Sequence, residues 1–499
     1  MNHYLAITLG SIGDTLQLTS TPAGLWAASY LFSELSKRIC VKLREKGHAI
    51  LTPWFPEGEF KSDGVGLFPD RIILEQGSAS LATLQPLIDA AIDEVGELLA
   101  MDENDAKKLQ GYLHSYLQVH AVAFETEGNP INDSKGFLAA AELERSFDRI
   151  DKGTLLHQLE RRDEDRSKNW PVKNSKLVDA LDTGWPLWHA KYNEDRLRED
   201  WRIRDLGDIA SDGRADYDEK EDTYDFKELL KKSRYYAVIQ ADGDNIGKAV
   251  CGLVPKKISK FSESCWKYAR EAAQLVQDFH GIPIYVGGDD LLAITPVENA
   301  DGKNVFWLMQ ELRDVFDKTF EAYKQGPEPP ALSFGVSIQY YKFPLYESLK
   351  QAGKLLFEHA KEANGKNAIA LRLQKHSGQS VDLLFPYGKS ELLTKLTAQI
   401  DDLPKNQEEC EKPNLLLHSI MTHLRLQKAV FEAALDHRVL EHAFKNVFHD
   451  GYGNNEAAFI EARELLNLCR GEEAPLVMTD KMLRLKKFFV EPGEEESHG

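Results

Sequence analysis

A short acidic hairpin between two apolar runs constrains this chain more than any other feature. Gly287-Gly288-Asp289-Asp290 follows Tyr285-Val286 and precedes Leu291-Leu292. Glycines permit a tight turn with positive φ and let a ligand approach the backbone without meeting a Cβ atom. The two aspartates then lie at the hairpin tip, where they can hold divalent cations. Gly and Asp are also common in ordinary turns. The tetrapeptide alone therefore fits either a cation-binding hairpin or a turn without a ligand.

A second acidic segment lies upstream and favours the metal-binding interpretation. Residues 235–241 form an aromatic and β-branched run that predicts a buried strand, and it ends in Asp242-Gly243-Asp244-Asn245-Ile246-Gly247-Lys248. A helix predicted over roughly 259–279 separates this strand from the hairpin. Strand, helix and antiparallel hairpin would bring Asp242 beside Asp289. Carboxylates that converge in this way repel one another and need a cation, for which Mg²⁺ or Mn²⁺ is the natural choice.

The pattern after the hairpin completes a known arrangement of elements. Amphipathic helices are predicted over 303–323 and 345–362, and strands over 331–340 and 368–373. The resulting βαββαβ order with an acidic hairpin is the ferredoxin-like palm arrangement. The sequence therefore predicts an α+β protein.

Residues 235–375 resemble the nucleotidyl-cyclase palm shared by GGDEF diguanylate cyclases, class III cyclases and the large subunit of type III CRISPR effector complexes. The resemblance is greatest to the large subunit in its III-B (Cmr) branch, the Cas-ten family. It is carried by the two acidic segments and by residues 342–347, 366–370 and 375–378. The opening of the chain is also similar to that subunit's first palm, at residues 5–10, 24–31 and 66–71, where Asp70 replaces the Asn of a "PNR" segment.

This resemblance implies two ferredoxin-like palm domains with interposed and C-terminal helical domains. We expect a first palm over 1–130, a charged helical linker over 131–230, a second palm over 231–375 and a helical domain over 376–499. Residues 112–124 are expected to form a strand of the first palm, 210–216 a flexible loop, and 376–490 helices throughout. The first palm has Thr52-Pro53-Trp54-Phe55 after its second strand and no carboxylate pair, so we expect it to be structural.

Composition restricts the partners and the compartment. The chain has 61 basic and 80 acidic residues, a formal net charge of −19, which disfavours a general nucleic-acid binder. The same charge fits a docking face for basic partners or simply a soluble surface. The five cysteines contain no CxxC pair, so we expect a reduced cytoplasm and no zinc. No apolar run reaches the length of a membrane span, and no membrane partner is expected.

By resemblance, the second palm would hold two Mg²⁺ or Mn²⁺ ions. Asp242, Asp289 and the carbonyl of Gly243 are the implied metal ligands. Asp290 is a second ligand or helps deprotonate a ribose hydroxyl, so the implied catalytic pair is Asp289 and Asp290. Lys361 aligns with a phosphate-contacting lysine, although it could equally be solvated. The residues expected to bind nucleotide are Asp244, Asn245, Gly247, Lys248, Gly287, Gly288, Ser333, Lys361 and Lys366.

The implied activity is RNA-activated synthesis of cyclic oligoadenylate from ATP in antiviral defence, with transfer of AMP to another acceptor as a close variant. The implied partners are ATP, the other subunits of a Cmr-type complex, and guide and target RNA. Two alternatives are a non-catalytic scaffold of the same ribonucleoprotein and a GGDEF-type cyclase acting alone. The intact acidic residues disfavour the scaffold, and Leu291 in place of the Phe that usually follows the acidic pair disfavours the lone cyclase.

No nuclease activity is expected. Longer relatives carry an N-terminal HD domain, whereas this sequence opens directly on the first palm. The late His449-Asp450 dipeptide fits a loop better than a nuclease site, because it lacks upstream histidine partners of metal-site character.

Overall fold

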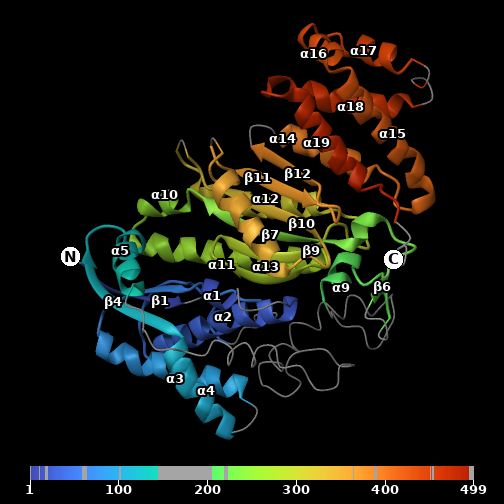
Figure 1. Cartoon of the computed structure of the whole chain (residues 1–499). Helices are drawn as coiled ribbons and strands as arrows, with labels where there is room; N and C mark the ends of the chain where they lie inside the picture. Colours follow the sequence, from blue (N-terminus) through green and yellow to red (C-terminus); the bar gives the residue numbers. More distant parts are fainter. Residues whose placement is uncertain are drawn as a thin grey trace.

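Two sheet-containing domains lie one above the other, and a helical domain extends from the second (Figure 1). The computed structural model describes residues 2–10, 12–16, 21–58, 65–100, 103–143, 205–218, 223–326, 328–363, 365–386, 390–449, 451 and 455–493. Strands and helices are both abundant, as the α+β prediction requires.

The first palm is a four-stranded antiparallel sheet with strand order β2-β3-β1-β4. Its central strand β1 pairs with β4 along its whole length, from Asn2 opposite Thr126 to Gly10 opposite Gln118. Its strands are β1 (Asn2–Gly10), β2 (Ile50–Thr52), β3 (Arg71–Glu75) and β4 (Gln118–Thr126). Its helices are α1 (Ile12–Leu16), α2 (Pro22–Glu45), α3 (Leu81–Leu99), α4 (Glu103–Tyr116) and α5 (Pro130–Glu142).

The prediction of a strand over 112–124 is wrong in its first half. Leu109, Leu113 and Tyr116 are buried at helical spacing, and Tyr112 stacks on Tyr116 one turn later at 5.6 Å. Helix α4 therefore continues to Tyr116, and the strand begins at Gln118. Aromatic residues favour strands on propensity, but a helical burial pattern overrides that preference.

The second palm is a six-stranded sheet with order β12-β11-β10-β7-β9-β8. All neighbours are antiparallel except β10 and β11. Its strands are β7 (Tyr235–Asp244), β8 (Ile282–Gly287), β9 (Asp290–Pro296), β10 (Ala331–Tyr340), β11 (Ala368–Gln374) and β12 (Ser380–Pro386). Its helices are α10 (Ile246–Cys251), α11 (Pro255–Asp278), α12 (Val305–Thr319) and α13 (Leu345–Lys354), with a short π-helix over Leu355–Ala360 after α13.

Strand β12 corrects the expectation of helices from residue 376 onward. Val381, Leu383 and Phe385 are buried in alternation with more exposed neighbours, which is the pattern of a strand with one covered face. The strand extends the second sheet by pairing with β11.

Part of the linker expected between the palms is ordered. Ala210 and Ser211 end the buried helix α9 (Leu206–Ser211), and Asp212 follows in a left-handed conformation with φ 55°. The flexible loop predicted over 210–216 is therefore wrong, because apolar packing and a helix cap fix its first half. A two-stranded ribbon follows, formed by β5 (Asp216–Asp218) and β6 (Thr223–Asp225). Residues 144–204 lie outside the described part of the chain.

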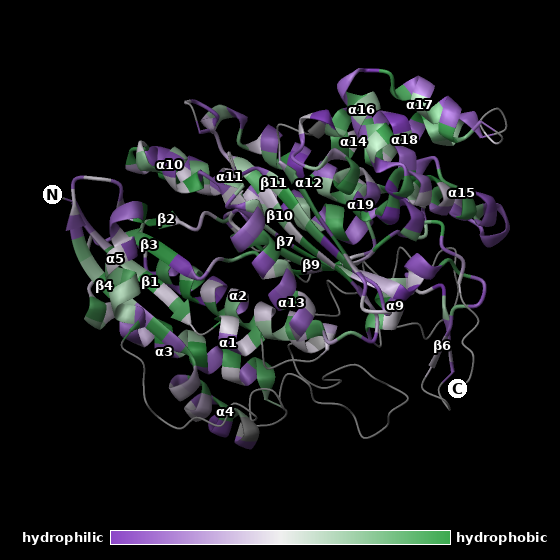
Figure 2. Cartoon of the chain, turned by 45° about the horizontal axis from the view of Figure 1, so that its top comes forward, coloured by the Kyte–Doolittle hydropathy of each residue, from purple (hydrophilic) through white to green (hydrophobic). Residues whose placement is uncertain are grey.

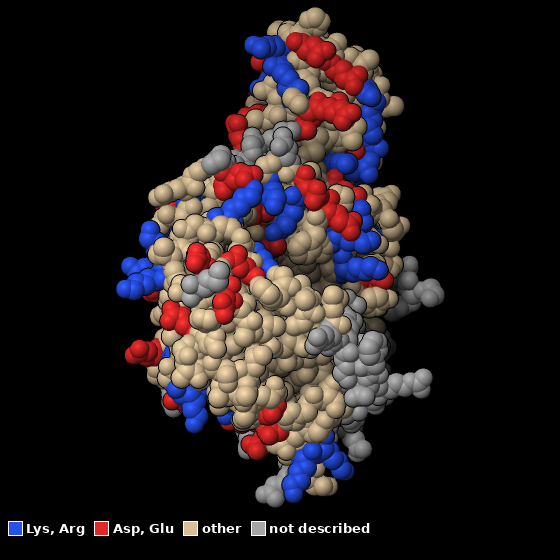
Figure 3. Space-filling model, turned by 90° about the vertical axis from the view of Figure 1, so that its left-hand side faces the viewer, with Lys and Arg blue, Asp and Glu red and all other residues tan. Residues whose placement is uncertain are grey.

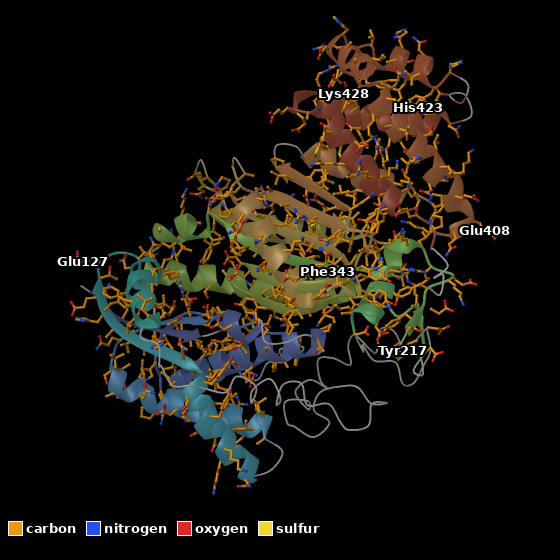
Figure 4. All side chains as sticks on the ribbon, viewed as in Figure 1. Glu127, Tyr217, Phe343, Glu408, His423 and Lys428 are labelled. Carbon is orange, nitrogen blue, oxygen red and sulfur yellow. The ribbon has the colours of Figure 1, made fainter. Side chains whose placement is uncertain are left out.

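The C-terminal domain consists of helices packed on the second palm through β12. Its helices are α14 (Ser390–Asp401), α15 (Gln407–Leu426), α16 (Lys428–Asp436), α17 (Leu440–Val447), α18 (Glu456–Leu468) and α19 (Pro475–Phe488). Phe488 packs edge-on against Tyr235 of β7 at 4.9 Å. Figure 4 shows Glu408 nearer the palms than His423 and Lys428, so α15 runs outward.

The palms pack on each other in a reciprocal manner. Helix α2 of the first palm contacts β8 of the second, and α11 of the second contacts β2 of the first. Figure 2 shows apolar residues concentrated along the strands and on the helix faces that cover them. Within the described ranges, no helix is long and apolar enough to cross a membrane.

Candidate metal and nucleotide site between the palms

Three carboxylates from two neighbouring strands meet at one edge of the second sheet. Asp242 lies near the end of β7, Asp289 in the turn after β8, and Asp290 at the start of β9. One oxygen atom from each carboxylate lies within 4.8 Å of the other two. The structure thus brings together the three aspartates whose proximity the sequence predicted.

Strand register and two glycines produce this convergence. Ala241 of β7 pairs with Leu291 of β9, which places the residue after each run at the same edge. Gly288 turns the hairpin with φ +71°, a conformation that favours glycine. At Gly243 an added Cβ would lie 2.5 Å from Oδ2 of Asp289, so a larger residue here would displace the Asp289 side chain.

The electrostatics of the cluster favour a cation. Burial, and then repulsion from Asp242, raises the pKa of Asp289 to about 7. Withdrawal from water and the charges of Asp289 and Asp242 raise the pKa of Asp290 well above its usual value, while the residue keeps an exposed surface toward the cleft. Clustered carboxylates of this kind are stabilised by a metal ion or a neighbouring positive charge.

Lys361 supplies such a positive charge. Its ammonium group contacts the Asp242 carboxylate, donates a hydrogen bond to the Gly243 carbonyl oxygen at 3.2 Å, and lies 3.8 Å from Oδ1 of Asp244. Lys361 directly follows the π-helix over Leu355–Ala360. The oxygen atoms that it contacts include two that the sequence assigned to metal ligation.

Asp244 and Ser333 lie beneath the site. The Asp244 side chain is buried, accepts a hydrogen bond from the Ser333 hydroxyl at 2.5 Å, and accepts another from the Asn367 backbone N–H at 2.7 Å. The Ser333 hydroxyl in turn accepts from the Ala368 N–H at 3.2 Å. These bonds tie β7, β10 and β11 together, and neither side chain lines the cleft described next.

A cleft of about 510 Å³ opens between the two palms over the carboxylates. Of the residues expected to bind nucleotide, Asn245, Gly247, Gly287 and Gly288 line it, together with Gly243, Asp289 and Asp290. Lys248 pairs with Glu328, and Lys366 is exposed in a left-handed turn with φ 52°. Neither of these two lysines lines the cleft.

The first palm supplies residues that the sequence analysis did not assign to the site. Trp54, Asp70, Asn132 and Lys135 line the cleft opposite the carboxylates. A Cβ on Gly247 would lie 3.4 Å from the Lys135 ammonium, so this lysine reaches across the cleft. Burial raises the pKa of Asp70. The resemblance at residues 66–71 could have pointed to Asp70. Trp54, Asn132 and Lys135 can be assigned to the cleft only once the packing of the two palms is known.

Helix α11 also contributes residues that sequence reasoning missed. Ser262, Cys265 and Trp266 line the cleft. The Ser262 hydroxyl accepts a hydrogen bond from the Trp54 N–H at 2.7 Å and lies 3.2 Å from the Thr52 hydroxyl. These contacts hold the first palm against the second beside the carboxylates.

Comparison with known proteins places this domain in a family. The sequence profile of the Cas10/Cmr2 second palm domain matches residues 235–370. Residues 235–370 are therefore similar to the second palm domain of the Cas10/Cmr2 family. The chain is 32% identical to the CRISPR system Cmr subunit Cmr2 of Pyrococcus furiosus, in an alignment that covers 34% of this chain and 23% of that protein. The matched region is thus less than a quarter of that relative's length.

Solved structures share the fold over almost the whole chain. A Csm1–Csm4 cassette in complex with AMPPNP matches with a TM-score of 0.51 and 14% identity, covering 98% of this chain and 70% of that one. The same cassette in complex with cA4 matches with a TM-score of 0.50 and 15% identity, over the same shares of the two chains. At these identities the matches establish a common fold.

Proposed function

We propose that this chain is the large subunit of a type III CRISPR effector complex and a metal-dependent nucleotidyltransferase that makes cyclic oligoadenylate from ATP. The observation that carries this proposal is the convergence of Asp242, Asp289 and Asp290, of which Asp289 and Asp290 line a cleft between the two palms. The relatives support it: one is named a Cmr subunit, and solved structures of the same fold contain AMPPNP or cA4.

The donor set fits Mg²⁺ or Mn²⁺. Hard carboxylate oxygens and a backbone carbonyl are the ligands that these cations prefer, and burial together with repulsion from Asp242 raises the pKa of Asp289, which a bound cation would counteract. Asp242, Asp289 and the Gly243 carbonyl would hold the ions, with Asp290 beside them. Bound there, the ions would neutralise triphosphate charge and make a ribose hydroxyl more acidic.

The chain's own residues would position the nucleotides, balance the phosphate charge and accept a proton. Lys361 does not line the cleft but contacts the Gly243 carbonyl oxygen beside it, where it would balance charge, and Lys135 lines the side of the cleft that the first palm supplies. The 3′-oxygen of one nucleotide forms a bond to the α-phosphorus of ATP, and the bond to pyrophosphate breaks, so that pyrophosphate leaves with the electron pair. Asp290 lines the cleft beside Asp289 and is the carboxylate that would accept the proton of the attacking hydroxyl.

RNA contacts and regulation belong to the complex in this proposal. Figure 3 shows acidic and basic side chains in separate small groups around a broad uncharged area. The net charge of −19 supports a role in which partner subunits would hold most of the guide and target RNA, and binding of target RNA would activate the site in antiviral defence. A typical coupling between two sites is about 1–3 kcal/mol, which a modest shift of one palm against the other can supply.

The test is turnover of ATP by the purified chain, alone and with its co-purifying partners and a complementary RNA, in Mg²⁺ or Mn²⁺. Products are resolved by mass spectrometry. Oligoadenylates that disappear in Asp289→Ala with Asp290→Ala, but persist in a control such as Asp314→Ala outside the cleft, support the proposal. An AMP conjugate would change the acceptor and keep the chemistry. No product under any RNA condition, from a folded complex, would support the scaffold role.

A further inference from the structure

A second cavity lies directly beside the cleft. It has a volume of about 470 Å³ and shares Trp54, Leu67 and Trp266 with the cleft lining. Its remaining wall includes Pro56 and Val65 of the first palm and Lys267, Arg270, Gln274 and Gln277 of α11. The three shared residues therefore form the boundary between the carboxylate cleft and this second space.

One face of α11 runs beneath both spaces. Ser262, Trp266, Arg270 and Gln274 follow one another at intervals of four residues, which places them on one side of the helix. Ser262 lines only the cleft, Trp266 lines both spaces, and Arg270 and Gln274 line only the second cavity. A molecule that extends from the carboxylates past Trp266 would therefore remain on a continuous surface.

The lining of the second cavity has the chemistry of a nucleotide subsite. The Trp54 and Trp266 rings lie 6.3 Å apart in an edge-on arrangement, and Phe68 packs against Trp266 at 5.3 Å, which fixes its orientation. Two cationic side chains, Lys267 and Arg270, lie around these rings with two amides, Gln274 and Gln277, and one carboxylate, Glu271, so the cations outnumber the acidic group. Indole rings accept a planar base, and cations accept its phosphate. A purely apolar ligand would not use the cations, and a free anion would not use the rings.

We propose that this cavity binds one nucleotide unit of a short oligonucleotide whose 3′ end lies in the cleft. Its base contacts Trp54 and Trp266, and its phosphate faces Arg270 and Lys267. This inference rests on the proposed function and deepens it, because it gives the site a separate place for an acceptor longer than one nucleotide. The carboxylates act on the 3′ end, while the cavity retains the 5′ end.

The experiment compares two ligands on the purified chain in metal-free buffer, where no turnover occurs. The probes are ATP and a linear diadenylate with a 5′-triphosphate. We expect the diadenylate to bind about tenfold more tightly, equivalent to about 1.4 kcal/mol. Arg270→Ala with Gln274→Ala should remove this preference and leave ATP affinity unchanged. Lys260→Ala, an exposed change on the same helix outside both linings, is the matched control.

Equal affinities of the two probes for the unmodified chain, or an equal loss of both in the double variant, would overturn the inference. A diadenylate carrying 8-azidoadenine in its 5′ unit gives a second measurement without substitution. Labelling of peptides that contain Trp54 or Trp266 supports the cavity, and labelling elsewhere contradicts it. Diadenylate preference without any product from ATP would overturn the proposed function alone. Product formation with no diadenylate preference would overturn the cavity alone.

Discussion

Four strands of each palm form the same framework, and the connection between the second and third of these strands differs sharply. Each palm begins with a central strand, a short helix and a 24-residue helix with proline in its first turn, α2 in one and α11 in the other. The strand orders β2-β3-β1-β4 and β8-β9-β7-β10 then coincide position by position. In the second palm, only Gly288 and Asp289 connect β8 to β9. In the first palm, residues 53–70 connect the corresponding strands, β2 and β3.

This difference separates chemistry from assembly. The tight connection in the second palm carries the carboxylates, whereas the long one in the first contacts the second palm. The Gly66 carbonyl accepts a hydrogen bond from the Val286 N–H at 3.1 Å, and Trp54 and Phe68 pack on Trp266. The expectation that the first palm provides an interface fits these contacts, but the same loop also lines the cleft with Trp54 and Asp70. A duplicated framework can thus have one active edge and one edge that completes its partner's site.

The largest expected effect is a difference in the rate of nucleotide transfer between variants that lose a carboxylate from the second palm and from the first. Asp242→Ala should lower nucleotide transfer by about a thousandfold, because a lost metal ligand forfeits several kcal/mol of transition-state stabilisation. Asp70→Ala, on the opposite wall, should cost no more than about tenfold, as expected for a positioning residue. Rates at saturating ATP and Mn²⁺ measure both. Equal losses would assign Asp70 to the catalytic set and end the distinction between the palms.

The lack of a side chain at Gly243, which leaves room for Asp289, should matter nearly as much for metal binding. Gly243→Ala places a Cβ 2.5 Å from the Asp289 carboxylate and 2.7 Å from Ile246, so Asp289 must move. We expect Mn²⁺ affinity to fall about a hundredfold, since ligand geometry is lost while all carboxylates remain. Gly252→Ala is the control, because nothing lies within 4 Å of its added Cβ. Calorimetric titration with Mn²⁺ compares them, and unchanged affinity in Gly243→Ala would remove Gly243 from the site.

Lys361 distinguishes the second palm further, because it gives the metal-free carboxylates a positive partner. Lys361→Met should raise the KM for ATP about tenfold through loss of positive charge beside the cleft. It should also lower the melting temperature in EDTA more than in Mn²⁺, because the ion replaces the missing charge. Lys366→Met, an exposed change outside the cleft lining, is the control. A loss of stability that Mn²⁺ does not reduce would show that Lys361 is only structural.

The pH dependence of stability should report the same cluster. A carboxyl whose pKa is raised on folding binds its proton more tightly in the folded state, so its contribution to stability falls as pH rises from about 4 to about 7. Relative to Asp289→Asn, the unmodified chain should therefore lose up to about 1.4 kcal/mol per pH unit across that window without metal. Mn²⁺ should reverse the loss at pH 7 and above. A pH-independent difference between the two proteins would contradict the raised pKa.

The second palm could be predicted from sequence because its signals are local. The run 331–340 matches β10, and the acidic segments follow apolar strands directly, so that register alone brings Asp242 to Asp289. The cleft could not be predicted, because Trp54, Asp70 and Lys135 reach it only through packing of one palm on the other. Asp244 and Ser333 illustrate the same limit. Their sequence positions suit a ligand site, but hydrogen bonds between strands bury them beneath it.

The smallest expected effect tests the contact that joins the palms. Ser262→Ala removes the hydroxyl that accepts a hydrogen bond from the backbone N–H of Trp54. The free energy of unfolding should fall by about 1 kcal/mol, because this backbone N–H loses its partner at the interface. Ser264→Ala, two residues along α11, removes only a hydroxyl bonded to its own helix at the Lys260 carbonyl and should be nearly neutral. Denaturant titration of both variants measures the difference. If ATP turnover also falls in Ser262→Ala while the double Arg270 and Gln274 variant keeps it, the first palm acts on the site through its position more than through the second cavity.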